Sequence, residues 1–446
     1  MSRWTRRIKH FLGTNVKAMQ AFQLLRQGSF ILGAIWLPNL GLEQEVIGAF
    51  EQLLYIGYSL SFFWVAGLIQ GLLSSYTDFS PQDRQRFLFN AYGLFMGLSS
   101  LVFIVMLCFP EFIFSVFTKS QAVPYYYLFC FYLLLNTPTF LLENIFLLKG
   151  KYRNIYLYGF YSFFAYLTVL ILPLILGYDF GYALAGLILM ALLKHIYLLG
   201  LIRKLGFVRF NFFLLRTWIV LSTPLILYAF LGGLMQTFDG WIINYWYNGD
   251  PEKFAIFRYG ARELPLVLAL SAAFGSAMLP EMRKNREQAL QAIRKKSLNL
   301  FHLLFPLSFL LLAFSDVWFP FLFTKSFEGS IIIFDTYLII VCSRLIFSRT
   351  ILIGLQDNKM VLYISVAELL INIGLSFYFI PHLGLFGVAL ATLVAFSVEK
   401  VFLCLYLWYR HNIPLNKYTN IPWWSIYSIV IIFLFIAKYI EKLSFT

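Results

Sequence analysis

The chain has 446 residues, of which 60% are apolar, 20% are aromatic and only 13% are charged, and its mean hydropathy is +0.76. Soluble domains are far less apolar, so this composition excludes a soluble protein and indicates a polytopic membrane protein. The net charge of +14 would suit a nucleic-acid partner, but basic residues that flank membrane spans account for much of it.

Apolar runs long enough to cross a bilayer follow one another along the chain. A spanning helix needs about 20 apolar residues, and twelve such runs are followed by a thirteenth. They lie near residues 20–40, 47–72, 87–109, 125–148, 156–176, 182–202, 218–244, 254–279, 298–315, 330–353, 360–380, 384–408 and 423–440. Backbone polar groups in hydrocarbon must bond within helices or closed barrels, and runs this long exclude strands, so we expect an all-α fold.

Lys and Arg are distributed unevenly between the predicted loops. If the N-terminus is cytoplasmic, the loops on that side carry Arg3, Arg6, Arg7, Lys9, Lys17, Arg84, Arg86, Lys149, Lys151, Arg153, Arg203, Lys204, Arg209, Arg216, Lys359, Arg410, Lys417 and the basic stretch 283–296. The opposite loops carry only Lys119, Lys253 and Lys325, with Lys438 and Lys442 near the C-terminus. The positive-inside rule therefore predicts a cytoplasmic N-terminus. We interpret the stretch 283–296 as a flank that contacts lipid headgroups and expect no nucleic-acid partner.

No catalytic or metal-binding motif is present in the sequence. The four cysteines lie in predicted spans without CxxC spacing, and the five histidines are scattered. HExxH, GxSxG and Gly-rich phosphate loops are absent, and the predicted outer loops are short. We therefore expect no enzymatic activity and no cofactor. The first apolar run is too long for a cleavable signal peptide and contains Arg26.

The two halves of the chain share sequence at a constant offset of 206 residues. The matching pairs are GYALAG from Gly181 and GVALAT from Gly387, Lys194 and Lys400, FTKS at 117–120 and 323–326, and AFEQ at 49–52 and AIFR at 255–258. An even number of helices per half gives both halves the same orientation in the membrane. We therefore expect two parallel six-helix lobes, residues 1–205 and 206–411, around a central cleft. Residues 412–446 form a linker and a thirteenth helix outside the repeat.

This layout resembles a known family. Three features carry the resemblance: the two parallel lobes, the G-x-A-L-A helix after a Pro-containing turn (LPLILGYDFG and IPHLGLFG), and FRYGARELPL at the start of the eighth helix. They are similar to the polysaccharide transport (Wzx-like, O-antigen flippase) branch of the MOP superfamily. This superfamily also contains MATE exporters and the lipid II flippase MurJ. The resemblance covers residues of about 15 to 410. It implies a V-shaped, MATE-like fold in the bacterial cytoplasmic (inner) membrane. It also implies movement of an undecaprenyl-pyrophosphate-linked oligosaccharide to the outer leaflet by alternating access, for cell-surface polysaccharide biosynthesis.

Charged residues inside the apolar runs are the candidate substrate site. A charge at bilayer depth costs at least ~2.5 kcal/mol, so such residues usually face a cavity or a partner. Arg258 and Arg262 are one turn apart on one helix face, and Glu263 is expected to pair with another helix. Arginine binds a diphosphate bidentately. The candidate substrate-binding residues are Arg26, Arg258, Arg262, Arg344, Lys194 and Lys400. Arg258 is also close enough to the surface to snorkel, and Lys194 and Lys400 are equally consistent with structural residues that close each lobe.

The resemblance carries further expectations for single residues. MurJ-like flippases have cavity arginines on the first, second and eighth helices. Arg26 and Arg258 or Arg262 match the first and eighth, whereas the second helix has Glu51 and Gln52, which argues against lipid II as substrate.

A second candidate site consists of acidic and polar residues in the second half. MurJ-like proteins can hold sodium with an Asp on the seventh helix, an Asn and a later Asp on the eleventh, and a Thr on the twelfth. The candidate cation-coupling residues are Asp239, Glu368, Asn372 and Thr392. Ser376 replaces the later acid, and Glu368 lies one turn earlier, so H+ is as good a coupling ion as Na+. Salt bridges from these acids to Lys400 or Arg344 are the structural alternative.

Three other functions compete with the flippase. A MATE-like multidrug exporter shares the fold, but a cavity for organic cations should be apolar and acidic. A lipid II flippase is disfavoured by the second helix, and a membrane glycosyltransferase or polymerase would need a large outer loop. The expected partners are a lipid-linked oligosaccharide, membrane lipid and a polysaccharide polymerase or chain-length machinery, with the protein acting as a monomer.

Overall fold

The computed structural model describes residues 15–76, 79–204 and 210–443. Throughout these residues the chain is helical, with no strand, which confirms the expected all-α fold. Ten of the described helices are long and apolar enough to cross a membrane, and a bent pair over 251–279 adds an eleventh candidate. The chain is therefore a multi-pass membrane protein. The basic residues Arg3, Arg6, Arg7, Lys9 and Arg209, which entered the orientation prediction, lie outside the described residues.

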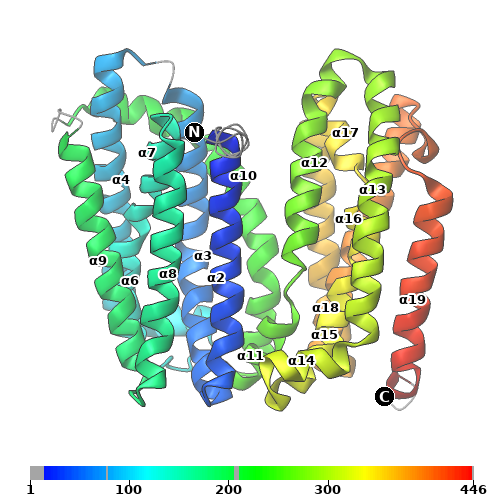
Figure 1. Ribbon diagram of the computed structural model, residues 1–446, viewed down its shortest axis with the longest axis horizontal. Helices are drawn as coiled ribbons and strands as arrows, with labels where there is room; N and C mark the ends of the chain where they lie inside the picture. Colours follow the sequence, from blue (N-terminus) through cyan, green and yellow to red (C-terminus); the bar gives the residue numbers. More distant parts are fainter. Residues whose placement is uncertain (1–14, 77–78, 205–209, 444–446) are drawn as a thin grey trace, which may run out of the picture. The chain divides into compact units, whose positions relative to one another are not determined.

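Unit 1 of the two compact units covers Met1–Glu252. Its helices are α2 (Asn15–Asn39), α3 (Gln44–Ser75), α4 (Pro81–Cys108), α5 (Pro110–Phe117), α6 (Tyr126–Asn136), η2 (Thr137–Phe140), α7 (Leu141–Leu148), α8 (Tyr152–Ile175), α9 (Phe180–Lys204) and α10 (Phe212–Trp246). Within this unit α10 packs on α3 and α2 packs on α8 (Figure 1). A glycine allows α3 and α10 to approach closely, because a Cβ on Gly67 of α3 would lie 2.5 Å from the Cα of Ile226 on α10. Gln52 on α3 adds a polar link, since its Nε2 donates to Asn244 Oδ1 at 2.8 Å and to Gly249 O at 2.9 Å.

Unit 2 covers Lys253–Thr446. Its helices are α11 (Pro251–Gly260, which begins two residues earlier), α12 (Pro265–Lys284), α13 (Arg286–Ala313), α14 (Ser315–Phe323), η3 (Lys325–Ser330), α15 (Ile331–Ile339), α16 (Val341–Arg344), α17 (Ser348–Gly354), α18 (Asn358–His411), η4 (Leu415–Lys417) and α19 (Ile421–Leu443). Figure 1 shows α19 beside α13 at one side of this unit.

The long element α18 contains two predicted spans. Its 54 residues would extend about 80 Å if the helix were straight. Gly384 breaks it, with φ 58° and ψ −138°, a conformation that favours glycine. Thr392 Oγ1 lies 3.5 Å from Asn372 Oδ1, twenty residues earlier, so the chain must reverse between them. The spans expected at 360–380 and 384–408 are therefore an antiparallel pair.

The helix boundaries follow the offset found in the sequence. The fourth span is divided into α6, η2 and α7 over 126–148, and the same positions shifted by 206 residues are 332–354. That interval coincides with α15, α16 and α17, which divide the tenth span. The short helix α5 likewise corresponds to α14. The repeat therefore includes the breaks of the fourth and tenth spans as well as the helices themselves. The break after α11 has no counterpart, because the corresponding positions lie within the continuous helix α3.

Packing divides the chain at a different place from the repeat. The repeat places the seventh helix in a second lobe that starts at residue 206, whereas α10 belongs to unit 1 because it packs along α3. The repeat boundary itself falls in residues 205–209, outside the described part, and stays a prediction. The first predicted span is helical as α2, but α2 is not among the ten candidates, because Gln20, Gln23, Arg26 and Gln27 reduce its hydropathy.

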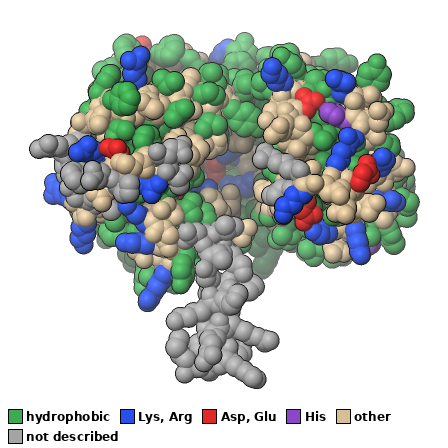
Figure 2. Space-filling view, turned by 90° about the horizontal axis from the view of Figure 1, so that it is seen from above, with side chains coloured by type: hydrophobic (Ala, Val, Ile, Leu, Met, Phe, Trp, Pro, Cys, Tyr) green, Lys and Arg blue, Asp and Glu red, His purple; other side chains and the backbone are tan. Residues whose placement is uncertain are grey.

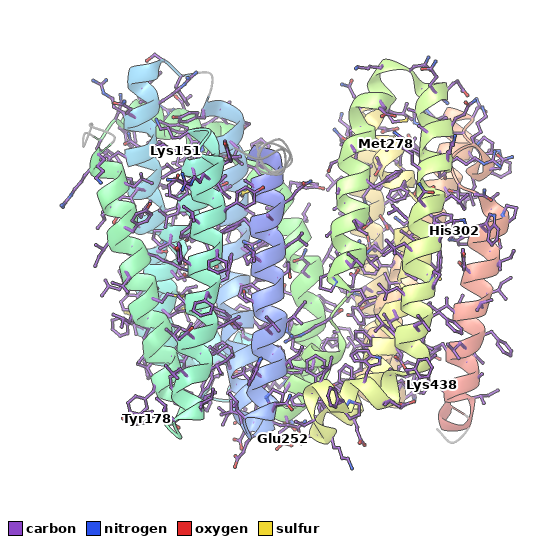
Figure 3. The ribbon with its side chains drawn as sticks, viewed as in Figure 1. Lys151, Tyr178, Glu252, Met278, His302 and Lys438 are labelled. Carbon is purple, nitrogen blue, oxygen red and sulfur yellow. The ribbon has the colours of Figure 1, made fainter. Side chains whose placement is uncertain are left out.

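Basic side chains gather at one end of unit 1. In unit 1, Arg84 Nε donates to Tyr76 O at 3.0 Å, and the Lys149 ammonium lies 5.9 Å from the Tyr76 ring, so the loops before α4 and α8 meet. Figure 2 shows Lys and Arg side chains at this end of unit 1. Figure 3 marks Lys151 at this end of α8 and Tyr178 at the other. Predicted loops rich in Lys and Arg thus meet in the folded unit 1, and which end faces the cytoplasm stays a prediction.

Candidate functional site: a broken helix and a buried ion cluster

The eighth predicted span, which contains RYGARELPL (258–266), is broken. α11 ends at Gly260, α12 begins at Pro265, and the two helices are bent by 53°. Proline causes the break, because it lacks an N–H and disfavours a helical residue before it, and Leu264 has φ −57° and ψ 116°. The expectation of one continuous helix over 254–279 is therefore wrong.

Tight packing holds α11 in place. Tyr259 is fully buried and stacks on Phe327 with ring centroids 4.3 Å apart. A Cβ on Gly260 would lie 2.6 Å from Ser330 O, so only glycine fits this approach. Ser330 Oγ in turn donates to Ile256 O at 2.7 Å. The end of α11 is thus anchored on η3, immediately before the break.

Arg258 and Arg262 lie on the two sides of the end of α11. Arg258 is in the last turn of α11, and Arg262 is in the linker, so the expected shared helix face is wrong. They stay adjacent nevertheless, because Arg262 Nε donates to Arg258 O at 3.3 Å. The Arg262 guanidinium lies 4.6 Å from the Tyr259 ring centroid. Both side chains are half-buried, so two positive charges lie next to each other at the break.

Glu263 in the same linker pairs with the tenth span, as expected of an acid in an apolar run. Arg344 Nε lies 3.0 Å from Glu263 Oε2, and Arg344 NH2 lies 2.6 Å from Glu263 Oε1. The geometry is bidentate, the strongest arrangement for arginine and a carboxylate. Arg344 is also 4.6 Å from the Phe396 ring centroid. Arg344 is therefore neutralised by a partner in unit 2.

A second set of charges lies close to this pair. Arg349 on α17 donates to Glu399 Oε1 at 2.7 Å from NH2 and at 3.2 Å from Nε, and to Ser365 Oγ at 2.8 Å. Its NH2 is 3.7 Å from Glu368 Oε2, and Lys400 Nζ is 3.6 Å from Glu399 Oε2. The acids are almost completely buried. Arg344 lies within electrostatic range of both. We call Glu263, Arg344, Arg349, Glu368, Glu399 and Lys400 the unit 2 ion cluster; its three acids balance its three bases.

Unit 1 has a smaller group of charges at corresponding positions. Glu143 is buried in α7 and lies within electrostatic range of Arg26 on α2 and Lys194 on α9. At the offset of 206 residues, Glu143 corresponds to Arg349, and Lys194 to Lys400. One acid thus faces two bases, and the group has an excess of positive charge.

The predicted cation-coupling residues are only partly brought together. Asn372 Oδ1 accepts hydrogen bonds from Ser376 Oγ at 3.2 Å and from Thr392 Oγ1 at 3.5 Å. Glu368, one turn earlier on α18, faces Arg349 instead. Asp239 is buried in α10 of unit 1. The two residues that match the family pattern therefore meet, and the role of all four stays a prediction.

Three charged residues of these groups were not identified from the sequence as site residues: Arg349, Glu399 and Glu143. Each lies in an apolar run, which is the signal that could have found them. Glu399 directly precedes Lys400, and Glu143 interrupts LLENIFLL at 141–148. The two repeat-related lysines required buried counter-charges, and these acids supply them. Arg26 belongs to unit 1 and Arg258 and Arg262 to unit 2, so their shared cleft stays a prediction.

Comparison with known proteins identifies the fold. No protein family and no curated sequence matches the chain. Among solved structures, it is similar to the lipid II flippase MurJ in an inward closed conformation, with a TM-score of 0.70 and 16% identity over 95% of this chain and 99% of that one. It is also similar to an inward-facing multidrug resistance MATE family transporter of the MOP superfamily, with a TM-score of 0.64, 16% identity and coverage of 86% and 93%.

A third similar structure is a MOP superfamily transporter from Pyrococcus furiosus, with a TM-score of 0.58, 14% identity and coverage of 91% and 97%. At such low identity the likeness establishes the fold, and function has to be argued from the site. The chain therefore has the fold of MOP superfamily flippases and transporters.

Proposed function

We propose that this chain is a flippase that moves an undecaprenyl-pyrophosphate-linked oligosaccharide across the bacterial cytoplasmic membrane, for cell-surface polysaccharide biosynthesis. The observation that carries the proposal is the broken eighth span in a MOP-type fold. Arg258 and Arg262 lie on the two sides of the end of α11 and contact each other, and α12 begins three residues after Arg262. Broken helices in transporters expose helix ends and polar groups to the substrate at membrane depth. A compact, multiply charged anion suits this arrangement better than an organic cation.

The pairing within unit 2 narrows the set of substrate residues. Arg344 and Lys400 have acidic partners, Glu263 and Glu399, so binding a diphosphate there would require these partners to be displaced. We assign the first contact with the diphosphate to Arg258 and Arg262 because they lie next to each other at the break of the eighth span. Arg26 and Lys194 are proposed to add positive charge from unit 1. Arg344 holds the linker through Glu263, and Lys400 neutralises Glu399.

Transport would proceed by alternating access with the polyprenyl tail in lipid. The diphosphate favours the conformation in which the arginines surround it, since a ligand shifts an equilibrium only by its differential affinity for the two states. A membrane potential that is negative inside contributes ~2.3 kcal/mol per charge per 100 mV toward export of the anion.

We further propose that Na+ or H+ couples to transport through Asp239, Glu368, Asn372 and Thr392. Asp239→Asn is expected to remove the dependence of transport on an ion gradient. Undiminished gradient dependence in this variant would contradict the coupling role of Asp239.

The proposed substrate class can be tested by binding to the purified protein. Undecaprenyl diphosphate should bind more tightly than undecaprenyl monophosphate, and ethidium should not compete. Each charge-assisted hydrogen bond contributes about 1.5–3 kcal/mol, so Arg262→Ala should weaken diphosphate binding about 10- to 100-fold. Arg262→Lys should fall between Arg262→Ala and the unaltered protein, because lysine keeps the charge but not the planar fork. Arg153→Ala, an exposed arginine at the end of unit 1, is the control and should change nothing.

A multidrug exporter is the second candidate, because a multidrug resistance MATE family transporter is among the similar structures. That function predicts saturable ethidium binding and no preference for a diphosphate. This outcome would overturn the flippase proposal.

A further inference from the structure

The last helix, α19, is bound to the rest of unit 2 by polar contacts near its C-terminal end. Lys438 Nζ lies 2.9 Å from Asp335 Oδ2, 2.9 Å from Asp316 Oδ2 and 3.2 Å from Leu312 O. Tyr439 donates to the same oxygen of Asp335 at 2.6 Å. Asp335 is fully buried in α15. Two adjacent residues of α19 thus bind one oxygen, Oδ2, of a buried carboxylate in the first segment of the tenth span.

A second contact lies at the other end of α19, where the tenth span is broken. In a continuous helix the amide of Ile346 would donate to Cys342 O, four residues earlier. Here it bonds to Ser343 O at 3.3 Å, so Cys342 O loses its helical donor. Trp424 Nε1 on α19 donates to Cys342 O at 2.9 Å. The indole therefore replaces the missing donor, which matters because an unsatisfied carbonyl is costly in hydrocarbon.

Aromatic contacts connect these two ends. Tyr427 stacks on Phe305 of α13 with ring centroids 5.2 Å apart, and its hydroxyl lies 2.8 Å from His302 Nδ1. Figure 3 marks His302 and Lys438 at two levels along the α13 and α19 pair. α19 is therefore docked on unit 2 near both of its ends.

The break that Trp424 supports belongs to the helix that carries Arg344. α16 is only four residues long, and Arg344 follows Cys342 by two positions. The bidentate bonds from Arg344 to Glu263 depend on the position of the guanidinium, because two N–H groups must meet the two carboxylate oxygens at once. Fixing Cys342 therefore fixes the backbone from which Arg344 reaches the linker of the eighth span.

We propose that α19 is a positioning helix for the substrate site: Trp424 and the Lys438–Asp335 contact hold the broken tenth span so that Arg344 binds Glu263 and shapes the linker between α11 and α12. The link to a substrate rests on the proposed function, whereas the positioning role concerns the protein alone. α19 lies outside the sequence repeat, so unit 2 obtains from it a support that the repeat does not provide.

The test is a double-mutant cycle between Trp424→Phe and Glu263→Gln, read as apparent melting temperature of the purified protein. Trp424→Phe removes the indole N–H and keeps an aromatic ring, and should lower the melting temperature by on the order of 5 °C. If α19 positions Arg344 for Glu263, the same change in the Glu263→Gln protein should produce less than half of that fall, because the interaction it supports is already absent. Trp408→Phe, at a more exposed tryptophan on α18, should show no shift and no coupling.

Equal falls in both backgrounds, within about 1 °C, would overturn the proposal, since sites that do not communicate are additive. Should Trp424→Phe not accumulate, Tyr439→Phe enters the same cycle under the same criterion, because it removes one donor to Asp335. No substrate is present in these measurements. Additive shifts would therefore refute the positioning role alone, and failure to bind a diphosphate would refute the proposed function alone.

Discussion

Glu263→Gln should destabilise unit 2 strongly, because it leaves the Arg344 guanidinium without its charged partner. Gln has nearly the same volume as Glu, so packing is preserved. Its NH2 group is a hydrogen-bond donor, however, and would face the Arg344 guanidinium, which also carries only donors. The two side chains are only 17% and 30% exposed, and both nitrogens of the fork are engaged. This is a partly buried pair in a membrane protein, and solvent cannot replace the lost carboxylate fully.

The magnitude follows from the burial of the pair. Breaking a buried ion pair by removing one partner costs about 3–5 kcal/mol. Arg344 is about one third exposed and lies within electrostatic range of Glu399, so we expect the lower end, about 3 kcal/mol. For a unit of about 150–250 residues, each kcal/mol lowers the melting temperature by ~2–4 °C. Glu263→Gln should therefore lower it by about 6–12 °C.

The assay is thermal denaturation in detergent, followed by the loss of monodisperse protein on gel filtration. Glu281→Gln is the matched control, because Glu281 pairs with Lys296 at 3.3 Å with both side chains about half exposed. Exposed pairs contribute about 0–1 kcal/mol. The double variant Glu263→Gln with Arg344→Met should recover part of the loss, since no buried charge is left unpaired. A shift no larger than that of Glu281→Gln, or a double variant as unstable as the two single losses added together, would refute the reasoning.

Further predictions concern packing and topology. Gly260→Val should abolish accumulation of folded protein, because its Cβ would lie 2.6 Å from a backbone oxygen of η3. Gly232→Ala has open space around it and should be tolerated or slightly stabilising. A normal yield of Gly260→Val on gel filtration would contradict the close approach. Gln52→Leu should cost about 1–3 kcal/mol in thermal denaturation, since two buried acceptors lose their donor, and an unchanged melting temperature would contradict this. A cysteine at Asn154 should resist an impermeant maleimide in intact cells while one at Asn248 reacts, and the reverse pattern would invert the topology.

The number and placement of the helices could be predicted because lipid imposes a length and a composition on each span. The two spans within α18 illustrate this, since each is an apolar run of the required length and Gly384 separates them. The repeat was equally accessible, and the offset of 206 residues also locates the breaks of the fourth and tenth spans. The packing of α10 in unit 1 was not accessible, because a repeat reports common ancestry of segments and not which segments touch.

The helix breaks differ in how far the sequence announces them. Pro265 marks the break after α11, although its apolar neighbours suggested one continuous helix. The break between α16 and α17 has neither proline nor glycine from residue 340 to 347. It depends on tertiary contacts such as the bond from Trp424 to Cys342 O. Sequence reasoning treated α19 only as an addition outside the repeat, and could not supply this contact.

The ion cluster shows a similar limit. That charged residues in apolar runs need partners follows from the cost of burying a charge, and Glu263 was expected to find one. Which partner each charged residue takes depends on how its helix is rotated. Glu368 faces Arg349. Among the described contacts, Glu368 forms no ion pair with Lys400 or Arg344, the two partners expected from the sequence. Glu399, directly before Lys400, takes the central position between two bases.

The most direct measurement of the central claim is the leaflet in which the lipid-linked oligosaccharide lies. In cells that lack this chain, the polyprenyl-diphosphate-linked oligosaccharide should accumulate and stay protected from an impermeant glycosidase or oxidant added outside the cytoplasmic membrane. Restoring the unaltered chain should make it accessible, whereas Arg262→Ala at equal protein abundance should not, and Arg262→Lys should do so partly. An oligosaccharide that is equally accessible with and without the chain, or fully exported by Arg262→Ala, would contradict the account.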